Sequence, residues 1–115
     1  PAVEKVKPGT MVMIEEMPMF PGGEKAIQRW IYGNIKMPAG VDRSTVREPV
    51  IVVFTVGKTG KIRDVRIKNS VHPILDAEAL RVVETMPDWS PGKQNGKPVD
   101  VYYQLPIDFK PVYLK

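Results

Sequence analysis

Residues 99–109 read VDVYYQLPIDF, and apolar side chains occupy every second position of this stretch. The apolar set is Val99, Val101, Tyr103, Leu105, Ile107 and Phe109. Because successive side chains of a β-strand point to opposite faces of its sheet, the alternation predicts a strand over 99–109 with one buried face and one solvated face. Pro106 has no N–H to donate to a neighbouring strand, so we expect this strand at an edge of the sheet.

The neighbour of this edge strand is expected in residues 50–56, with the sequence VIVVFTV. This stretch is apolar on both faces, which is typical of a central strand. The glycines of loop 57–61 (GKTGK) suit a hairpin, and residues 62–69 form the return strand. The first apolar residue of that return strand is out of step with the later ones, which predicts a β-bulge near Arg63. Strand 50–56 should therefore lie between 62–69 and 99–109.

Two other segments have the period of an amphipathic helix, and each is followed by proline. Segment 24–36 places Ile27, Trp30, Ile31 and Ile35 on one face, and segment 74–86 does the same with Leu75, Ala79, Val82, Val83 and Met86. Residues 11–16 contain a short apolar run that predicts a first strand. Residues 1–10 (PAVEKVKPGT) read as the end of a linker, which leaves 11–115 as the domain. Residues 88–98 (DWSPGKQNGKP) carry turn-forming residues throughout.

These elements follow one another in the order β-α-β-β-α-β and predict an α+β fold. We expect an antiparallel sheet of three strands plus a short N-terminal strand, with two helices packed on one face. The chain of 115 residues is long enough for one domain with an ordinary core. The expected core consists of Ile27, Trp30, Ile31, Val52, Phe54, Leu75, Val83, Val101, Tyr103 and Leu105. Trp89 is either a core plug, that is, a buried side chain that fills space in the core, or an exposed anchor for a partner.

The composition leaves little material for catalysis. There is no cysteine, and the single histidine, His72, directly precedes Pro73 where a helix is expected to begin. A residue in this position is better explained by the start of the helix than by catalysis or metal binding. No phosphate-binding glycine motif occurs, and the few close carboxylates either point to opposite faces or suit a helix dipole. We therefore expect no enzyme, no cofactor and no metal.

The formal net charge of +4 includes a basic cluster around the predicted hairpin. Its members are Lys58, Lys61, Arg63, Arg66 and Lys68. One interpretation is a nucleic-acid-binding face. We favour a solvated strand whose charges discourage edge pairing, because no motif of stacking aromatic residues accompanies the charge. Nucleic acid is therefore not expected as a partner.

The outer edge of strand 99–109 is the most informative feature for function. Its outward N–H and C=O groups are unpaired in the predicted sheet, and Pro106 blunts only the far end. Such an edge is either covered by another segment or used to capture a peptide strand. The short strand 11–16 is the candidate for a covering segment.

Several fragments, taken in order, resemble one family. Residues 75–80 (LDAEAL) through 86–92 (MPDWSPG) look like a helix followed by a Trp-x-Pro-Gly turn. The other fragments are 18–23 (PMFPGG), the strand 50–56 with its hairpin, 96–99 (GKPV) and 105–109 (LPIDF). Together they resemble the C-terminal domain of TonB-type energy transducers over about residues 16–109.

The resemblance implies a periplasmic, non-enzymatic domain that is anchored to the inner membrane by a segment absent from this chain. Such domains bind the TonB box, a short extended peptide of outer-membrane transporters. Through the absent N-terminal region they receive proton-motive energy from the ExbB–ExbD motor. The peptide joins the sheet beside the last strand, so the candidate partner-binding residues are Val99, Asp100, Val101, Tyr102, Tyr103, Gln104 and Leu105. An open edge of this kind also permits a homodimer.

Two alternatives remain beside the transducer interpretation. The same fold can serve as the partner-binding domain of a membrane sensor or a peptidase-linked regulator. The basic hairpin can also belong to a nucleic-acid-binding module, for which binding would depend steeply on salt.

Overall fold

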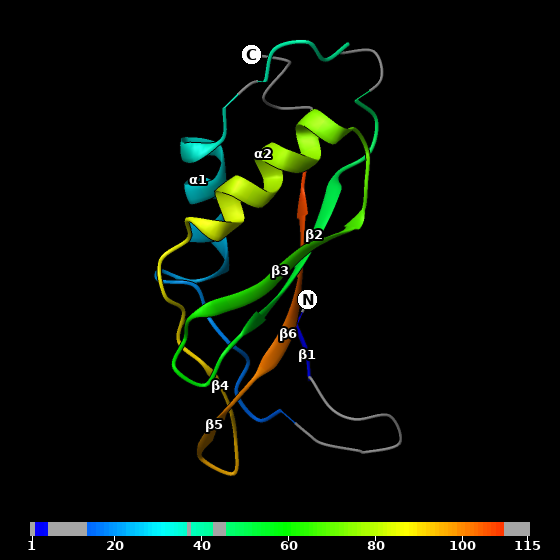
Figure 1. Cartoon of the computed structure of the whole chain (residues 1–115). Coiled ribbons are helices and arrows are strands. Elements are labelled where there is room, and N and C mark those ends of the chain that lie inside the picture. The colour runs from blue at the N-terminus through cyan, green and yellow to red at the C-terminus, as the bar shows by residue number, and fades with distance from the viewer. Residues whose placement is uncertain (1, 5–13, 37, 43–45, 110–115) are drawn as a thin grey trace.

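The computed structural model describes residues 2–4, 14–36, 38–42 and 46–109, and shows two layers, a sheet with two helices on one of its faces (Figure 1). The elements are β1 (Ala2–Glu4), α1 (Glu24–Asn34), β2 (Val50–Val56), β3 (Ile62–Asn69), α2 (Pro73–Glu84), β4 (Gly92–Gln94), β5 (Lys97–Val99) and β6 (Val101–Ile107). The main sheet has the order β1-β6-β2-β3, and every adjacent pair is antiparallel. The predicted α+β class and the central position of residues 50–56 are therefore confirmed.

The bulge predicted in the return strand is also present. Between Val53 and Thr55 of β2 the opposing strand advances from Arg66 to Arg63, so β3 carries an extra residue there. Asp64 has a positive φ of 56°, a left-handed conformation that aspartate tolerates better than most residues. The out-of-step apolar residue at the start of β3 is explained by this local change of register.

The predicted position of the first strand is wrong, and so is the predicted order of elements towards the C-terminal end. The first strand of the sheet is Ala2–Glu4, inside the stretch read as a linker, and it is β1 that pairs with β6. Residues 11–13 of the predicted first strand lie outside the described residues, and Glu16 forms only an isolated bridge to Lys93 of β4. A strand of three residues is too short to show periodicity, which is why the sequence pattern did not reveal β1.

The region read as turns throughout contains a second small sheet. Strands β4 and β5 form an antiparallel hairpin around Asn95 and Gly96, whose φ values are 52° and 74°. Two consecutive positive φ angles are typical of the tight turns favoured by Asn-Gly. The predicted strand 99–109 is correspondingly shorter, because the chain leaves the strand at Asp100 and β6 begins at Val101. The observed order is β-α-β-β-α-β-β-β.

The core lies between the helices and the sheet. All the predicted core residues are buried except Trp30, which is half-buried and packs against the cluster. Trp89 is only 3% exposed, so of its two interpretations the core plug is the observed one. His72 is the N-cap of α2, where its Nδ1 accepts a hydrogen bond from the Ile74 N–H at 3.1 Å. The interpretation of His72 as a helix-start residue is confirmed.

Candidate partner-binding site at the edge of the sheet

The outer edge of β6 is the centre of the candidate site. The predicted residues Val101–Leu105 lie in β6, Val99 ends β5, and Asp100 connects the two strands. On its inner side β6 pairs with β2 along its whole length. On its outer side β1 pairs only with Val101–Tyr103, and no residue in the described part of the chain pairs with that outer side beyond Tyr103. The edge therefore accepts a short antiparallel strand and continues past it.

The position of Pro106 indicates which backbone groups of β6 face outward. Pro106 lies opposite Ile51 in the ladder with β2, and that ladder continues to Ile107. A proline is tolerated in a strand where the missing N–H would have pointed away from the neighbouring strand. Because N–H groups alternate in direction along an antiparallel strand, the N–H groups of Tyr102 and Gln104 point outward as well.

Two of the predicted site residues lie on the sheet face opposite the helices, where they meet the basic residues of β3. Arg66 donates a hydrogen bond to the Tyr102 hydroxyl at 3.0 Å, and its guanidinium lies 5.4 Å from the centre of the Tyr102 ring. The Lys68 Nζ donates to Gln104 Oε1 at 2.6 Å. These two basic side chains, considered above for nucleic acid, are thus engaged with the polar face of β6, across β2.

The Asp100 side chain connects the start of β6 to the hairpin formed by β2 and β3 through a hydrogen bond and an ion pair. Its Oδ1 accepts a hydrogen bond from the Lys58 N–H at 3.0 Å, and its carboxylate forms an ion pair with Arg63. The hydrogen bond from Arg63 lowers the pKa of the Asp100 carboxyl, so it is charged at neutral pH. Within the predicted site, Asp100 therefore holds the loop that precedes the return strand β3.

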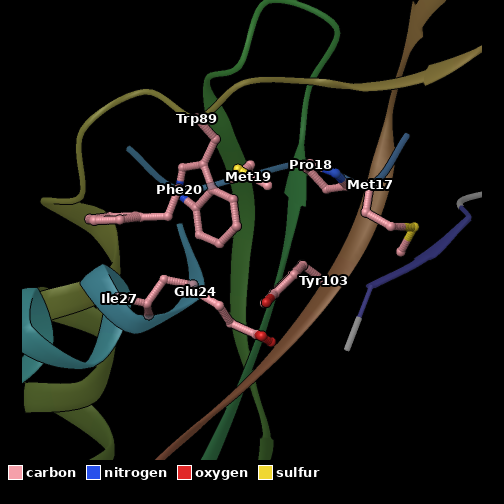
Figure 2. A pocket seen from close by; sticks show the side chains of 8 residues that line it. All are labelled: Met17, Pro18, Met19, Phe20, Glu24, Ile27, Trp89 and Tyr103. Atoms are coloured by element: carbon pink, nitrogen blue, oxygen red, sulfur yellow. The ribbon is translucent and has the colours of Figure 1, made fainter. Parts of the chain in front are cut away.

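An apolar pocket opens beside Tyr103 on the helix-bearing face (Figure 2). It has a volume of about 340 Å³ and is lined by Met17, Pro18, Met19, Phe20, Glu24, Ile27, Trp89 and Tyr103. The Trp89 ring packs against Tyr103 at a centroid distance of 4.9 Å and against Phe20 at 5.6 Å. Burial, followed by the charge of Glu24, raises the pKa of the Tyr103 hydroxyl, which is therefore neutral.

The segment Met17–Phe20 forms one wall of this pocket and was not predicted as part of the site. It is held by the Met19–Ser90 bridge, in which each residue's N–H donates to the other's carbonyl. Met17 and Met19 remain 47% and 57% exposed. In sequence, this stretch reads only as the approach to the first helix. The available signal was a pair of methionines flanking Pro18 in a segment without strand or helix periodicity.

The fold and this edge define a class: a small α+β domain in which the outer edge of β6 is paired over only three residues, by β1. In the described ranges, no group of His, Asp and Glu side chains could hold a metal ion. No helix among those ranges is both long and apolar enough to cross a bilayer.

The family model for the C-terminal domain of Gram-negative bacterial TonB proteins matches residues 38–111, and the chain belongs to this family. Searches of curated proteins and of solved structures gave no match. Family membership implies energy transduction to TonB-dependent outer-membrane transporters by a non-enzymatic domain. The matched residues run from just after α1 through β6, so β1, α1 and the segment Met17–Phe20 lie outside them.

Proposed function

We propose that this chain is the periplasmic peptide-binding domain of an energy transducer, and that it binds the TonB box of a transporter by strand addition to the outer edge of β6. Contact with the ExbB–ExbD motor and the anchor in the inner membrane belong to sequence outside these residues. One observation carries the proposal: β6 already takes on an antiparallel strand at Val101–Tyr103, and its edge continues past that strand.

In the proposed binding step, the partner peptide displaces β1 and pairs with the outer edge of β6 in its stead. β1 contributes three residues to the sheet, opposite Val101–Tyr103. A transporter peptide of about five to seven residues in extended form covers more of the edge, including the outward N–H of Gln104. Backbone pairing, less the cost of ordering a free peptide and displacing β1, gives an expected affinity in the micromolar range, roughly −7 to −9 kcal/mol.

The proposal is tested by titrating the isotope-labelled chain with a synthetic peptide from the N-terminal region of a TonB-dependent transporter. We expect the largest backbone amide shifts at Val99–Leu105 and saturation at micromolar peptide. Shifts confined to residues 58–68 would contradict the edge model and favour the basic hairpin as the binding face. A scrambled peptide of the same composition is the control for non-specific binding.

Weakening β1 should strengthen partner binding. Val3 of β1 lies opposite Tyr102 of β6. Because the N–H and C=O of Tyr102 point outward, these two residues form the pair that exchanges backbone hydrogen bonds between β1 and β6. Val3→Pro removes one of the donors, so the edge is open in a larger fraction of molecules and the apparent dissociation constant falls, by about threefold or more. The measurement is a peptide titration by calorimetry.

Val3→Thr is the matched control for this prediction, because it keeps both the N–H and a high β-propensity. It should bind like the unaltered chain. An unchanged or weaker affinity of the Val3→Pro chain would show that β1 does not compete for the edge.

A further inference from the structure

We propose that the pocket beside Tyr103 is a specificity subsite, which takes one apolar side chain of the peptide that joins β6. This inference rests on the proposed function and extends it to the sequence of the partner. The peptide residue concerned is the one that lies directly opposite Tyr103.

The position of Tyr103 links the edge to the pocket. Tyr103 is part of the strand that accepts a neighbour, and its ring also lines the pocket and stacks on Phe54 in the core. Residues directly opposite one another in an antiparallel pair project from the same face of the sheet. A peptide residue opposite Tyr103 therefore projects from the helix-bearing face, where the pocket opens. The register of β1 shows that a strand can take this position, because Ala2 lies opposite Tyr103.

The size and lining of the pocket favour a single apolar side chain. A volume of about 340 Å³ is at the small end of the range for ligand sites, roughly 300–1,000 Å³. Met17 and Met19 are flexible and polarisable, so they can adjust to side chains of different shape. Both expose large apolar surface that an incoming side chain would remove from water.

Among the described lining residues, the Glu24 carboxylate disfavours an acidic side chain in the pocket. Glu24, in the first turn of α1, contributes a carboxylate beside the Tyr103 hydroxyl, as Figure 2 shows. A second carboxylate brought into this partly enclosed space would be repelled. We therefore infer a preference for leucine, methionine or phenylalanine and discrimination against aspartate and glutamate.

The pocket is a property of this chain and not of the matched region alone. Of the described residues that line it, only Trp89 and Tyr103 fall within 38–111. The remaining wall comes from the segment Met17–Phe20 and from α1. Variation in that segment is thus a route by which domains with the same sheet edge can select different peptides.

The test measures the interaction between a peptide position and a pocket residue in a double-mutant cycle. A host peptide of about seven residues, taken from the N-terminal region of a transporter, is prepared with leucine or serine at each position in turn. Each pair of peptides is titrated against the unaltered chain, Met19→Gln and Ile74→Gln. Ile74 is 38% exposed on α2 and does not line the pocket, so Ile74→Gln is the matched control.

At one peptide position, the change from leucine to serine should weaken binding to the unaltered chain by about tenfold. The loss should shrink to about twofold or less in Met19→Gln and stay about tenfold in Ile74→Gln. Circular dichroism checks that both variants are folded. With methyl-labelled methionine, a peptide carrying phenylalanine at that position should shift the Met17 and Met19 methyl signals and leave Met86 unchanged.

Two negative results have different meanings. If peptides bind with amide shifts along β6, but every leucine-to-serine loss is the same in Met19→Gln as in the unaltered chain, the subsite is refuted and strand addition survives. If no peptide binds, or binding leaves β6 unshifted, the proposed function is refuted and the subsite is refuted with it.

Discussion

Gly60→Ala is expected to lower the free energy of unfolding by about 3–5 kcal/mol, because the new methyl group would overlap the backbone at Trp89. Gly60 has a φ of 88°, and a Cβ at this position would lie 1.9 Å from the Trp89 carbonyl oxygen. The same two residues are joined by a hydrogen bond from the Trp89 N–H to the Gly60 carbonyl at 2.8 Å. Alanine would push the tryptophan backbone away and loosen its ring from Phe20, Phe54 and Tyr103.

Gly96→Ala separates the effect of the clash from that of the backbone conformation. Gly96 also has a positive φ, of 74°, but a Cβ added there would have no described atom within 4 Å. This variant should lose only about 1–2 kcal/mol, the cost of a left-handed alanine. Urea unfolding followed by Trp fluorescence measures both. Equal losses in the two variants would mean that the approach of Trp89 to Gly60 contributes nothing specific.

Gln104→Pro is expected to abolish binding of the transporter peptide while the domain stays folded. The N–H of Gln104 points outward, beyond the last residue that β1 covers, so proline removes a donor that only the partner would use. Pro106, two residues further along the same strand, shows that the ladder with β2 accommodates a proline ring at an outward position. Loss of one central donor and the bulk of the ring should weaken a micromolar peptide by about a hundredfold, beyond detection by calorimetry.

The control for this variant is Gln104→Ala, which removes the side chain and its hydrogen bond to Lys68 but keeps the backbone donor. It should bind within about threefold of the unaltered chain, because the contact with Lys68 is exposed to solvent. Peptide binding by a folded Gln104→Pro chain would exclude the outer edge of β6 as the site.

Much of the fold follows from patterns that are local in sequence. The run of residues that is apolar on both faces predicted the central position and the bounds of β2, because a strand buried on both faces is typical of the middle of a sheet. The bulge near Arg63 was visible as a break in alternation. The alternation before Pro106 identified the strand that carries the candidate edge, and both helices followed from apolar positions at helical spacing.

The parts that the sequence did not reveal depend on pairing between distant, short segments. β1 has three residues and owes its place to the outer groups of β6, about a hundred positions away along the chain. The hairpin β4–β5 has no apolar alternation and forms around Asn95 and Gly96, so its residues read as turn. The pocket combines Met17–Phe20, α1, Trp89 and β6, and no motif connects these segments in sequence. Similarly, the contact of Arg66 with Tyr102 crosses β2 and depends on register.

The different pairing on the two sides of β6 determines how the domain would respond to pulling. A peptide bound antiparallel to β6 and pulled along its axis loads its hydrogen bonds in shear, so that they share the tension. The ladder between β6 and β2 spans all seven residues of β6, from Val101 to Ile107. A peptide of about five to seven residues on the outer side pairs with no more of the strand than this and finds no donor at Pro106. The pairing between the peptide and the outer edge of β6 is therefore expected to break at a lower force than the ladder between β6 and β2. Under rising tension the partner should dissociate before the sheet unfolds, so that the domain stays intact and can bind again.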